Sequence, residues 1–233
     1  MNKLFGGLIC GALLSLNVAD SLATVIDVPS TGGDYQAFGE SEWRPGRFHS
    51  SAWGQTFRLE AGDGQYLESI SFSLLDYTFD DSNIDFTFYI YEWDGIKIVG
   101  DSIFSTGVLS TDDSGEKNVF NLDLGYAQID LGTDYMWLLN VSHDGVAGAG
   151  GVFDSYDGDY TNGSFYTFLN DGNLNALFTN GWQEVCPSGC RDLAFTLNTV
   201  DASPVPLPQS ALLFLSGIIS LLGLPRKSDK CGE

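Results

Sequence analysis

Basic residues are scarce in this sequence: 10 Lys and Arg stand against 31 Asp and Glu, which gives a formal net charge of −21. A protein that binds nucleic acid neutralises phosphates with clustered Lys and Arg, and the central part of this chain has no such cluster. The same shortage argues against docking on an anionic lipid surface. We therefore expect no nucleic-acid partner.

Histidine and cysteine are also rare, with two and four residues respectively. Since a zinc site draws on several nitrogen and sulfur ligands, the sequence offers little for one. His49 and His143 each lie beside a serine, but neither serine stands in the Gly-x-Ser-x-Gly turn that exposes a catalytic nucleophile. We interpret both as ordinary loop or strand-end histidines.

Long apolar runs are missing except at the two ends. Lys3 precedes an apolar stretch over residues 4–18, and small residues follow at Ser21 and Ala23. This pattern predicts a secretory signal peptide over residues 1–23, removed by signal peptidase after Ala23. The alternatives are an N-terminal membrane anchor and a buried helix. Lipidation at Cys10 is not favoured, because no small residue precedes that cysteine.

The C-terminal end combines a proline motif, an apolar stretch and a basic stop. The motif is Val205, Pro206, Leu207 and Pro208, the apolar stretch is 211–224, and the stop is Arg226 and Lys227. The stretch is 14 residues long, shorter than the roughly 20 that span a bilayer comfortably. The basic pair would hold this end in the cytoplasm, and the prolines keep the preceding chain extended and open to a protease.

This arrangement resembles the PEP-CTERM sorting signal of Gram-negative bacteria that make exopolysaccharide, in its Val-Pro-Leu-Pro variant. The resemblance implies that an exosortase, a membrane cysteine protease, recognises and cuts residues 205–233. It also implies export across the inner membrane by the secretion machinery, a transient membrane-anchored stage, and then a place on the cell surface or in the extracellular matrix. Two departures are Leu207, where the family usually has Glu, and the extra tail 228–233.

Two other C-terminal signals share this layout, and a plain membrane anchor remains a further alternative. Residues 207–211 echo the sortase motif Leu-Pro-x-Thr-Gly, but both the Thr and the Gly are missing. A GPI signal would end on apolar residues, without Arg226 and Lys227.

Period-two alternation of apolar and polar residues runs through the chain between the two ends. Such runs, rich in Phe, Tyr, Ile and Thr, predict half-buried strands. The predicted strands are 54–59, 69–74, 85–91, 119–124, 135–141, 164–169 and 192–197. Residues 135–141 begin apolar on both faces, which indicates a central strand. We expect a loop or an edge strand over 31–51.

Gly, Asn and Asp separate these strands at short intervals, as tight turns require. No stretch has helical periodicity with caps, and no internal repeat is present. The fold class we predict is all-β: a jelly-roll-like antiparallel β-sandwich over residues 24–204, flanked by the N-terminal signal helix and the C-terminal membrane-anchoring helix.

Several segments of the body extend the resemblance. Residues 54–57, 67–72, 88–95 and 131–135, together with the Asp157–Gly163 stretch, look like a recurrent β-sandwich of PEP-CTERM proteins, over about residues 53–198. The resemblance implies a location and a shape, and it implies no chemistry.

Cys186 and Cys190 are the one cysteine pair of the predicted exported domain. In an oxidising compartment, two cysteines joined through Pro and Gly favour a local disulfide. Free thiols are the alternative. Redox or metal chemistry is less favoured, because it usually uses the closer Cys-x-x-Cys spacing.

Residues 154–163 concentrate acidic side chains on a turning backbone. Asp154, Asp157 and Asp159 supply the hard oxygen ligands that Ca²⁺ prefers, although the spacing is not that of an EF-hand. Two interpretations stay open: a structural calcium site and a solvated acidic turn. No other cofactor is expected.

Aromatic residues suggest a second function. Trp93 and Trp182 lie at the edges of turns, where an exposed indole could stack on sugar rings, although tryptophan usually lies in or near a core. Paired carboxylates could serve glycoside hydrolysis, but so many acids are present that some pair will always fit. The leading hypothesis is an exported, non-enzymatic protein of the cell surface or biofilm matrix. The alternatives are an exopolysaccharide-binding module, with or without Ca²⁺, and a glycoside hydrolase.

Overall fold

A computed structural model describes residues 23–31, 36–38, 52–76, 83–112, 117–141, 151–153, 155–156, 160–168, 175–185 and 192–201. All of them lie in the first of two units of the chain, Met1–Ala202. The predicted signal peptide, apart from Ala23, and the predicted sorting signal lie outside the described residues. Within the described ranges, no helix is long and apolar enough to cross a bilayer.

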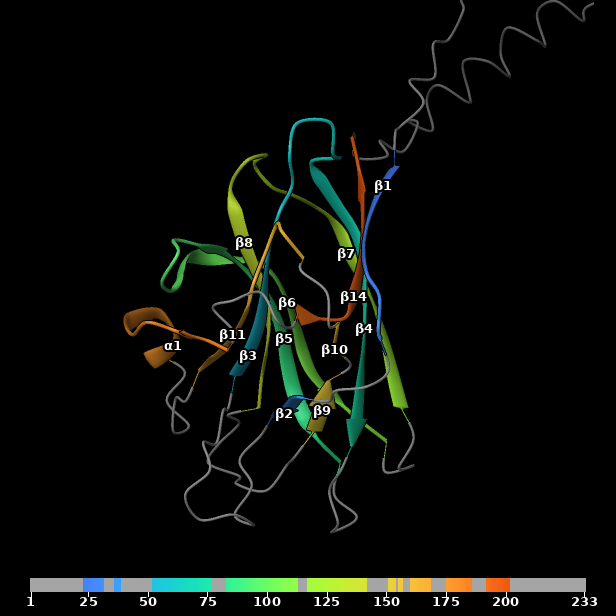
Figure 1. The fold of residues 1–233 in the computed structure, drawn as a ribbon, viewed down its shortest axis with the longest axis vertical. Helices are drawn as coiled ribbons and strands as arrows, with labels where there is room; N and C mark the ends of the chain where they lie inside the picture. Colours follow the sequence, from blue (N-terminus) through green and yellow to red (C-terminus); the bar gives the residue numbers. More distant parts are fainter. Residues whose placement is uncertain are drawn as a thin grey trace, which may run out of the picture. The chain divides into compact units, whose positions relative to one another are not determined.

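Two six-stranded antiparallel sheets form the domain, seen together in Figure 1. Sheet 1 consists of β1 (Ala23–Val28), β14 (Phe195–Val200), β4 (Tyr66–Asp76), β7 (Lys117–Gln128), β9 (Gly151–Phe153) and β2 (Gln36–Phe38). Sheet 2 consists of β12 (Gln183–Glu184), β11 (Phe165–Phe168), β3 (Ala52–Arg58), β8 (Asp134–Asn140), β5 (Asp85–Trp93) and β6 (Ile98–Ser110). Three smaller elements are β10 (Ser155–Tyr156), β13 (Asp192–Leu193), which pairs with β10, and α1 (Ala176–Thr179).

The strand order is that of a jelly roll. Its eight main strands, in chain order, are β1, β3, β4, β5, β6, β7, β8 and β14. In sheet 1 the main strands lie in the order β1, β14, β4, β7, which are the first, eighth, third and sixth of the eight. In sheet 2 the order is β3, β8, β5, β6, which are the second, seventh, fourth and fifth. The chain thus alternates between sheets as a double Greek key does, and the predicted fold class is confirmed.

Alternation along the strands builds the core between the sheets. The side chains of Phe72 on β4, Phe88 on β5 and Trp137 on β8 are buried, and Phe72 stacks on both partners, with ring centroids 5.6 and 5.7 Å away. Strand β8 lies between β3 and β5, so the prediction of a central strand at 135–141 is confirmed.

Some elements were not expected from the sequence. Strands β1 and β6 fall in segments for which we predicted none, and the predicted strand 192–197 is two strands, β13 and β14, separated by Ala194. Within 31–51, the described residues are Thr31 and the short strand β2. Residues 151–193 carry β9 to β13 and α1, so these elements are an insertion between the last two strands of the jelly roll.

Candidate functional site

The outer face of sheet 2 is the most distinctive surface of the domain, because it is aromatic where an outer face is usually polar. Side chains alternate along β5, so Phe86, Phe88 and Ile90 point inward and the residues between them point outward. The outward set on sheet 2 includes Tyr89, Tyr91 and Trp93 of β5, Met136 and Leu138 of β8, and Tyr166 and Phe168 of β11. These side chains belong to a second hydrophobic cluster, separate from the one between the sheets.

A short strap covers this face. We use strap for residues 175–185, which contain α1 and β12 and which lie beside β11 and the tip of the β5–β6 hairpin in Figure 1. The Trp182 backbone N–H donates to the Ile96 carbonyl at the hairpin tip (2.8 Å), and its indole Nε1 donates to the Leu177 carbonyl (3.2 Å). Leu177 is buried in the cluster. The insertion therefore supplies the cover that sheet 2 needs over its aromatic face.

The strap also decides the surroundings of the two predicted sugar-binding tryptophans. Trp93 is only 6% exposed and Trp182 only 8%, and their rings meet edge to face at 6.3 Å. Trp93 also packs on Tyr166 (4.7 Å), and Trp182 packs on Phe168 (5.4 Å). The sequence left open whether these indoles are exposed at turn edges or lie in a core, and the structure buries both against each other across sheet 2. Neither offers a free ring face for a sugar.

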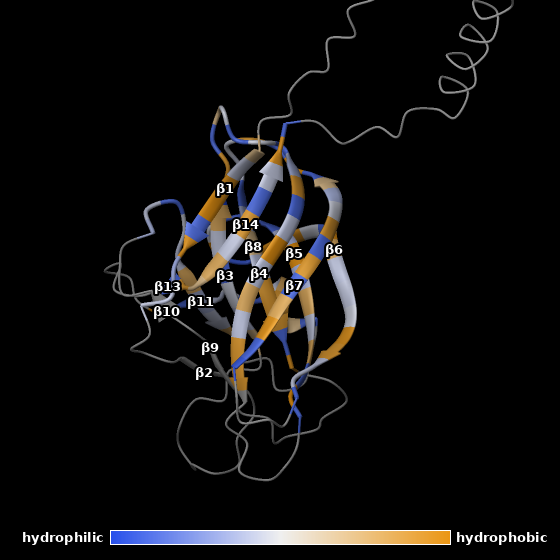
Figure 2. Ribbon diagram, turned by 90° about the vertical axis from the view of Figure 1, so that its right-hand side faces the viewer, coloured by the Kyte–Doolittle hydropathy of each residue, from blue (hydrophilic) through white to orange (hydrophobic). Residues whose placement is uncertain are grey.

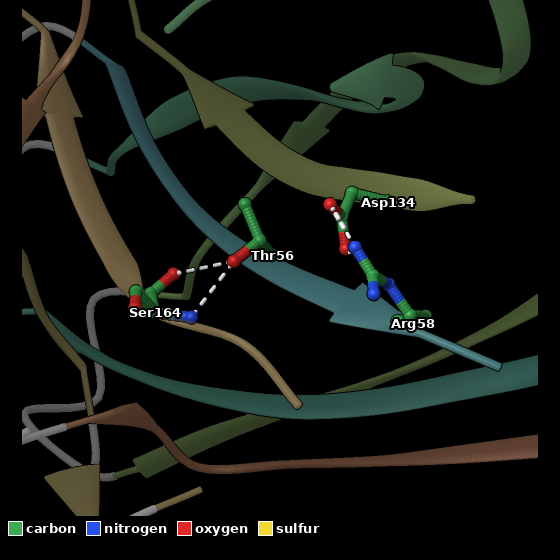
Figure 3. Close-up of polar contacts among 4 residues, drawn as sticks. All are labelled: Thr56, Arg58, Asp134 and Ser164. Carbon is green, nitrogen blue, oxygen red and sulfur yellow. Dashed lines mark hydrogen bonds and ion pairs between the residues drawn. The ribbon is translucent and has the colours of Figure 1, made fainter. Parts of the chain in front are cut away.

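A polar rim borders the aromatic face where β3 ends and β8 begins (Figure 3). The Arg58 guanidinium forms two hydrogen bonds with the Asp134 carboxylate: Nε donates to Oδ1 at 2.7 Å, and Nη2 donates to Oδ2. Hydrogen bonding to Asp134, followed by its charge, raises the pKa of Arg58. Both side chains are more than a third exposed, so the pair adds little to stability despite its geometry.

The neighbouring contact between Thr56 and Ser164 ties β3 to the start of β11 (Figure 3). The Ser164 backbone N–H donates to Thr56 Oγ1 (2.7 Å), and the same hydroxyl donates to the Ser164 carbonyl (3.1 Å). Gly163 lies so close that a Cβ there would stand 1.9 Å from the Thr56 carbonyl oxygen. These polar groups satisfy one another, so the rim connects neighbouring strands.

A buried carboxylate on the opposite side of β3 was missed from the sequence. Gln55, fully buried, donates through Nε2 to Asp192 Oδ1 (2.8 Å) and accepts the Leu193 N–H at Oε1 (2.9 Å). The other oxygen, Asp192 Oδ2, accepts the Tyr160 N–H (3.0 Å). The signal that could have found this network is Gln55 itself, an amide at an inward position of a predicted strand.

Tyr160 lies beside this network. Its ring meets Phe195 edge to face at 5.8 Å, and its buried hydroxyl has no hydrogen-bond partner among the described residues. Burial, followed by the negative charges of Asp192 and Asp63, raises the pKa of Tyr160 above its usual range. A phenol in this state is a poor acid. The hydrogen bonds among Gln55, Asp192, Tyr160 and Leu193 anchor the insertion to the core.

The remaining predicted site residues lie outside the described ranges. They are the sorting motif Val205, Pro206, Leu207, Pro208, Arg226 and Lys227, the cysteines Cys186 and Cys190, the candidate calcium ligands Asp154, Asp157 and Asp159, and the histidines His49 and His143. In the part of the chain that is described, no group of three or more His, Cys, Asp or Glu is placed to hold a metal ion. The disulfide and the calcium site therefore stay predictions.

Comparison with known proteins gives distant structural likenesses only. No protein-family model matches the chain, and neither does any curated protein. A structure of the cysteine protease and lectin-like domains of Cwp84, a surface layer associated protein of Clostridium difficile, is similar over 65% of this chain and 32% of its own, with 10% identity and a TM-score of 0.38. A structure of infectious bursal disease virus, Gt strain, is similar over 87% of this chain and 48% of its own, with 14% identity and a TM-score of 0.31. The chain thus spans about a third and about half of these two, and neither likeness bears on its activity.

Proposed function

We propose that this chain is an exported, exosortase-processed, non-enzymatic protein of the cell surface or biofilm matrix. The observation that carries the proposal is the sequence pattern of the two ends: a predicted signal peptide over 1–23, and a proline motif, apolar stretch and basic stop within 205–233. In the fold, β1 pairs with β14. Ala23, the last residue of the predicted signal peptide, is the register partner of Val200, five residues before the predicted sorting motif begins. Both predicted membrane-directed segments therefore join the sandwich at neighbouring points of one sheet.

The position of β14 also bears on when the domain can fold during export. Strand β14 lies between β1 and β4, so sheet 1 is complete only when the last strand of the domain has been added. The described sheets therefore need the chain through Val200. Removal of the sorting segment by an exosortase would leave the hydrogen bonds of β14 intact.

The non-enzymatic part of the proposal rests on the sequence, in which neither histidine lies beside a nucleophile motif and acids are too many for any pair to be diagnostic. The polar pairs around sheet 2, Arg58 with Asp134 and Thr56 with the Ser164 backbone, connect neighbouring strands. Because Trp93 and Trp182 are buried, sugar binding at these two residues has lost its supporting observation, and we do not propose it there.

Expression in a Gram-negative host with and without its exosortase tests the proposal. We would follow the full chain and a variant lacking residues 205–233 by cell fractionation and by intact mass. In the presence of exosortase, the full chain should reach the surface or matrix fraction as a species that begins at Thr24 and lacks the apolar stretch 211–224. An unprocessed C-terminus in that strain, or identical processing and location of the two chains, would overturn the proposal.

A further inference from the structure

Strand β7 lies at an open edge of sheet 1. Figure 2 shows β1, β14, β4 and β7 side by side in that order. Among the described strands, β7 pairs with β4 and with no other, so half of its backbone N–H and C=O groups face away from the sheet. An edge of this kind is a template for one more strand, and proteins usually blunt it with charges, prolines, bulges or short length.

The other edge strands of the two sheets are blunted in one of these ways. Strand β12 has two residues and β2 has three. Strand β6 is longer, but its register against β5 shifts twice. Strand β1 is six residues long, and its one charged side chain, Asp27, is acidic like most charged groups of this domain. A second copy of β1 would therefore bring another acid and no base.

The regular part of β7 runs from Lys117 to Asp123. Over this range β7 pairs with β4 without interruption. Beyond it, β4 makes a bulge at Glu68, and Gly125 and Tyr126 have positive φ, 64° and 59°. Bulges and left-handed residues break strand pairing, so a further strand fits the regular part of β7 best.

The charges of this range are arranged so that it complements itself. Lys117 and Asp123 are exposed on the outer face of sheet 1, at equal distances along the chain from Phe120. If two copies of β7 pair antiparallel about a two-fold axis at Phe120, Lys117 of each copy lies directly opposite Asp123 of the other, on the same face. A shift by one residue would turn the side chains to the wrong face, and a shift by two would set Lys117 opposite Asn121 or Gly125 of the other copy. The charge pattern therefore selects one partner and one register.

Apolar side chains on both faces of β7 fit the same register. On the outer face, Val119 is 59% exposed and lies between the two charged residues. On the inner face, Phe120 stacks on Phe72 at 5.4 Å, yet Phe120 and Leu122 are only partly buried. The two-fold pair sets Phe120 against Phe120 of the other copy and covers the exposed parts of Val119 and Leu122. Aromatic pairs across strands and removal of apolar surface from water both stabilise such a contact.

We propose that two copies of this chain associate through β7, paired antiparallel from Lys117 to Asp123 about a two-fold axis at Phe120. The contact is isologous, and it joins sheet 1 of the two copies into one continuous sheet. The segment has no net charge, so this edge brings two acidic domains together with little local repulsion. A single strand pair is small beside the roughly 1,600 Å² of a standard interface, so we expect a weak dimer with a Kd on the order of 100 µM. The inference goes beyond the proposed function and does not depend on export.

Sedimentation equilibrium of the purified full chain, in a density-matched non-ionic detergent at about 150 mM NaCl, tests the inference. The parent chain should show a monomer–dimer equilibrium. Lys117→Asp and Asp123→Lys each set like charges opposite one another at two points of the dimer, so each should weaken association at least tenfold. An equal mixture of these two variants places opposite charges at both points again, in a heterodimer. The mixture should therefore associate about as strongly as the parent.

Two further variants separate this edge from net charge and from misfolding. Lys97→Asp, at the β5–β6 hairpin, changes the net charge as much as Lys117→Asp does and should leave association unchanged. Asp123 Oδ1 accepts the Gly125 N–H at 2.8 Å, and Asp123→Asn keeps an acceptor there while removing the charge, so it should weaken association several-fold at an unchanged melting temperature.

Three results would overturn the inference. The parent could stay monomeric up to about 1 mM, tenfold above the expected Kd. The charge-reversed variants Lys117→Asp and Asp123→Lys could associate as strongly as the parent, as they would if the apolar ends of the chain made the contact. Their mixture could also associate no more strongly than each variant alone, which would exclude the pairing of Lys117 with Asp123 across two copies.

Discussion

Several buried polar residues of this domain attach the insertion, residues 151–193, to strand β3. Gln55 and Asp192 illustrate this: both are buried, and between them they satisfy two backbone N–H groups of the insertion, those of Tyr160 and Leu193. A buried carboxylate costs free energy unless several donors compensate it. The network therefore favours one placement of Tyr160 and Leu193 against β3, because other placements would leave the carboxylate without these donors.

Replacement of Tyr160 by Phe should stabilise the domain. The Phe keeps the edge-to-face contact with Phe195 and removes a buried hydroxyl that has no partner among the described residues, a change we expect to raise the unfolding free energy by about 1 kcal/mol. Urea unfolding at pH 7.5 measures it, with Tyr66→Phe on β4 as the control for losing a half-buried tyrosine hydroxyl. A less stable Tyr160→Phe protein would show that the hydroxyl is bonded.

The same variant carries a pH prediction. The folded state raises the pKa of Tyr160, so it holds that proton more tightly than the unfolded chain does. The resulting stability is fully present below about pH 10 and is lost as the pH rises through the folded-state pKa. Between pH 7.5 and 10.5, the parent should therefore lose about 1 kcal/mol more than Tyr160→Phe does. Parallel losses in the two proteins would contradict this assignment.

At the scale of elements, the insertion between β8 and β14 changes what the jelly roll exposes. Its strand β11 widens sheet 2 beside β3, and its strap covers the aromatic face. Tight backbone approach makes this possible at Gly163, which lies against the Thr56 carbonyl where β11 begins.

Gly163→Ala should separate β11 from β3. A Cβ at 1.9 Å from the Thr56 carbonyl oxygen cannot be accommodated without moving the backbone, which would also break the bonds between Thr56 and Ser164. We expect a loss of about 2–3 kcal/mol in urea unfolding. Gly107→Ala on β6 is the matched control, because its Cβ would meet no atom within 4 Å, and it should be neutral or slightly stabilising. Equal stability of the two variants would contradict the close approach.

Trp182→Ala tests whether the strap belongs to the cooperative unit. The side chain is 8% exposed and contacts Trp93 and Phe168, so its loss should cost about 3 kcal/mol if strap and sandwich unfold together. Val108→Ala, at a residue 60% exposed, should change little. An unchanged midpoint for Trp182→Ala, with faster hydrogen exchange confined to 175–185, would mean that the strap opens alone.

At the scale of the whole molecule, the excess of acid is the dominant electrostatic fact. Four of the 10 basic residues lie in the predicted targeting ends, whereas 28 of the 31 acidic residues lie between them. Like charges on a compact domain repel one another, and this repulsion keeps molecules apart at a cost in stability.

Salt should therefore stabilise the protein. Raising NaCl from about 10 to 150 mM shortens the screening length from roughly 30 to 8 Å, which weakens the repulsion among the acidic groups. It also weakens the exposed Arg58–Asp134 pair, but that pair contributes little to stability. We expect the melting temperature to rise by about 2–4 °C, equivalent to about 1 kcal/mol at this size. Millimolar CaCl₂ at matched ionic strength should add to this rise only if Asp154, Asp157 and Asp159 bind calcium. A fall with NaCl would show that ion pairs outweigh repulsion.

The sequence by itself determined the fold class and most of the strands, because period-two alternation is a local property that each strand carries regardless of its partners. The same alternation accounts for the burial of Phe72, Phe88 and Ile90. Strand β1 escaped prediction because it directly follows the apolar signal segment, and β6 because an exposed edge strand alternates weakly. Tertiary structure alone decided which surfaces are covered: Trp93 and Trp182 are buried by each other across 89 residues of chain, and Glu68 meets Tyr126 through a bulge and a left-handed turn. Such contacts depend on register and strand order, which no local pattern encodes.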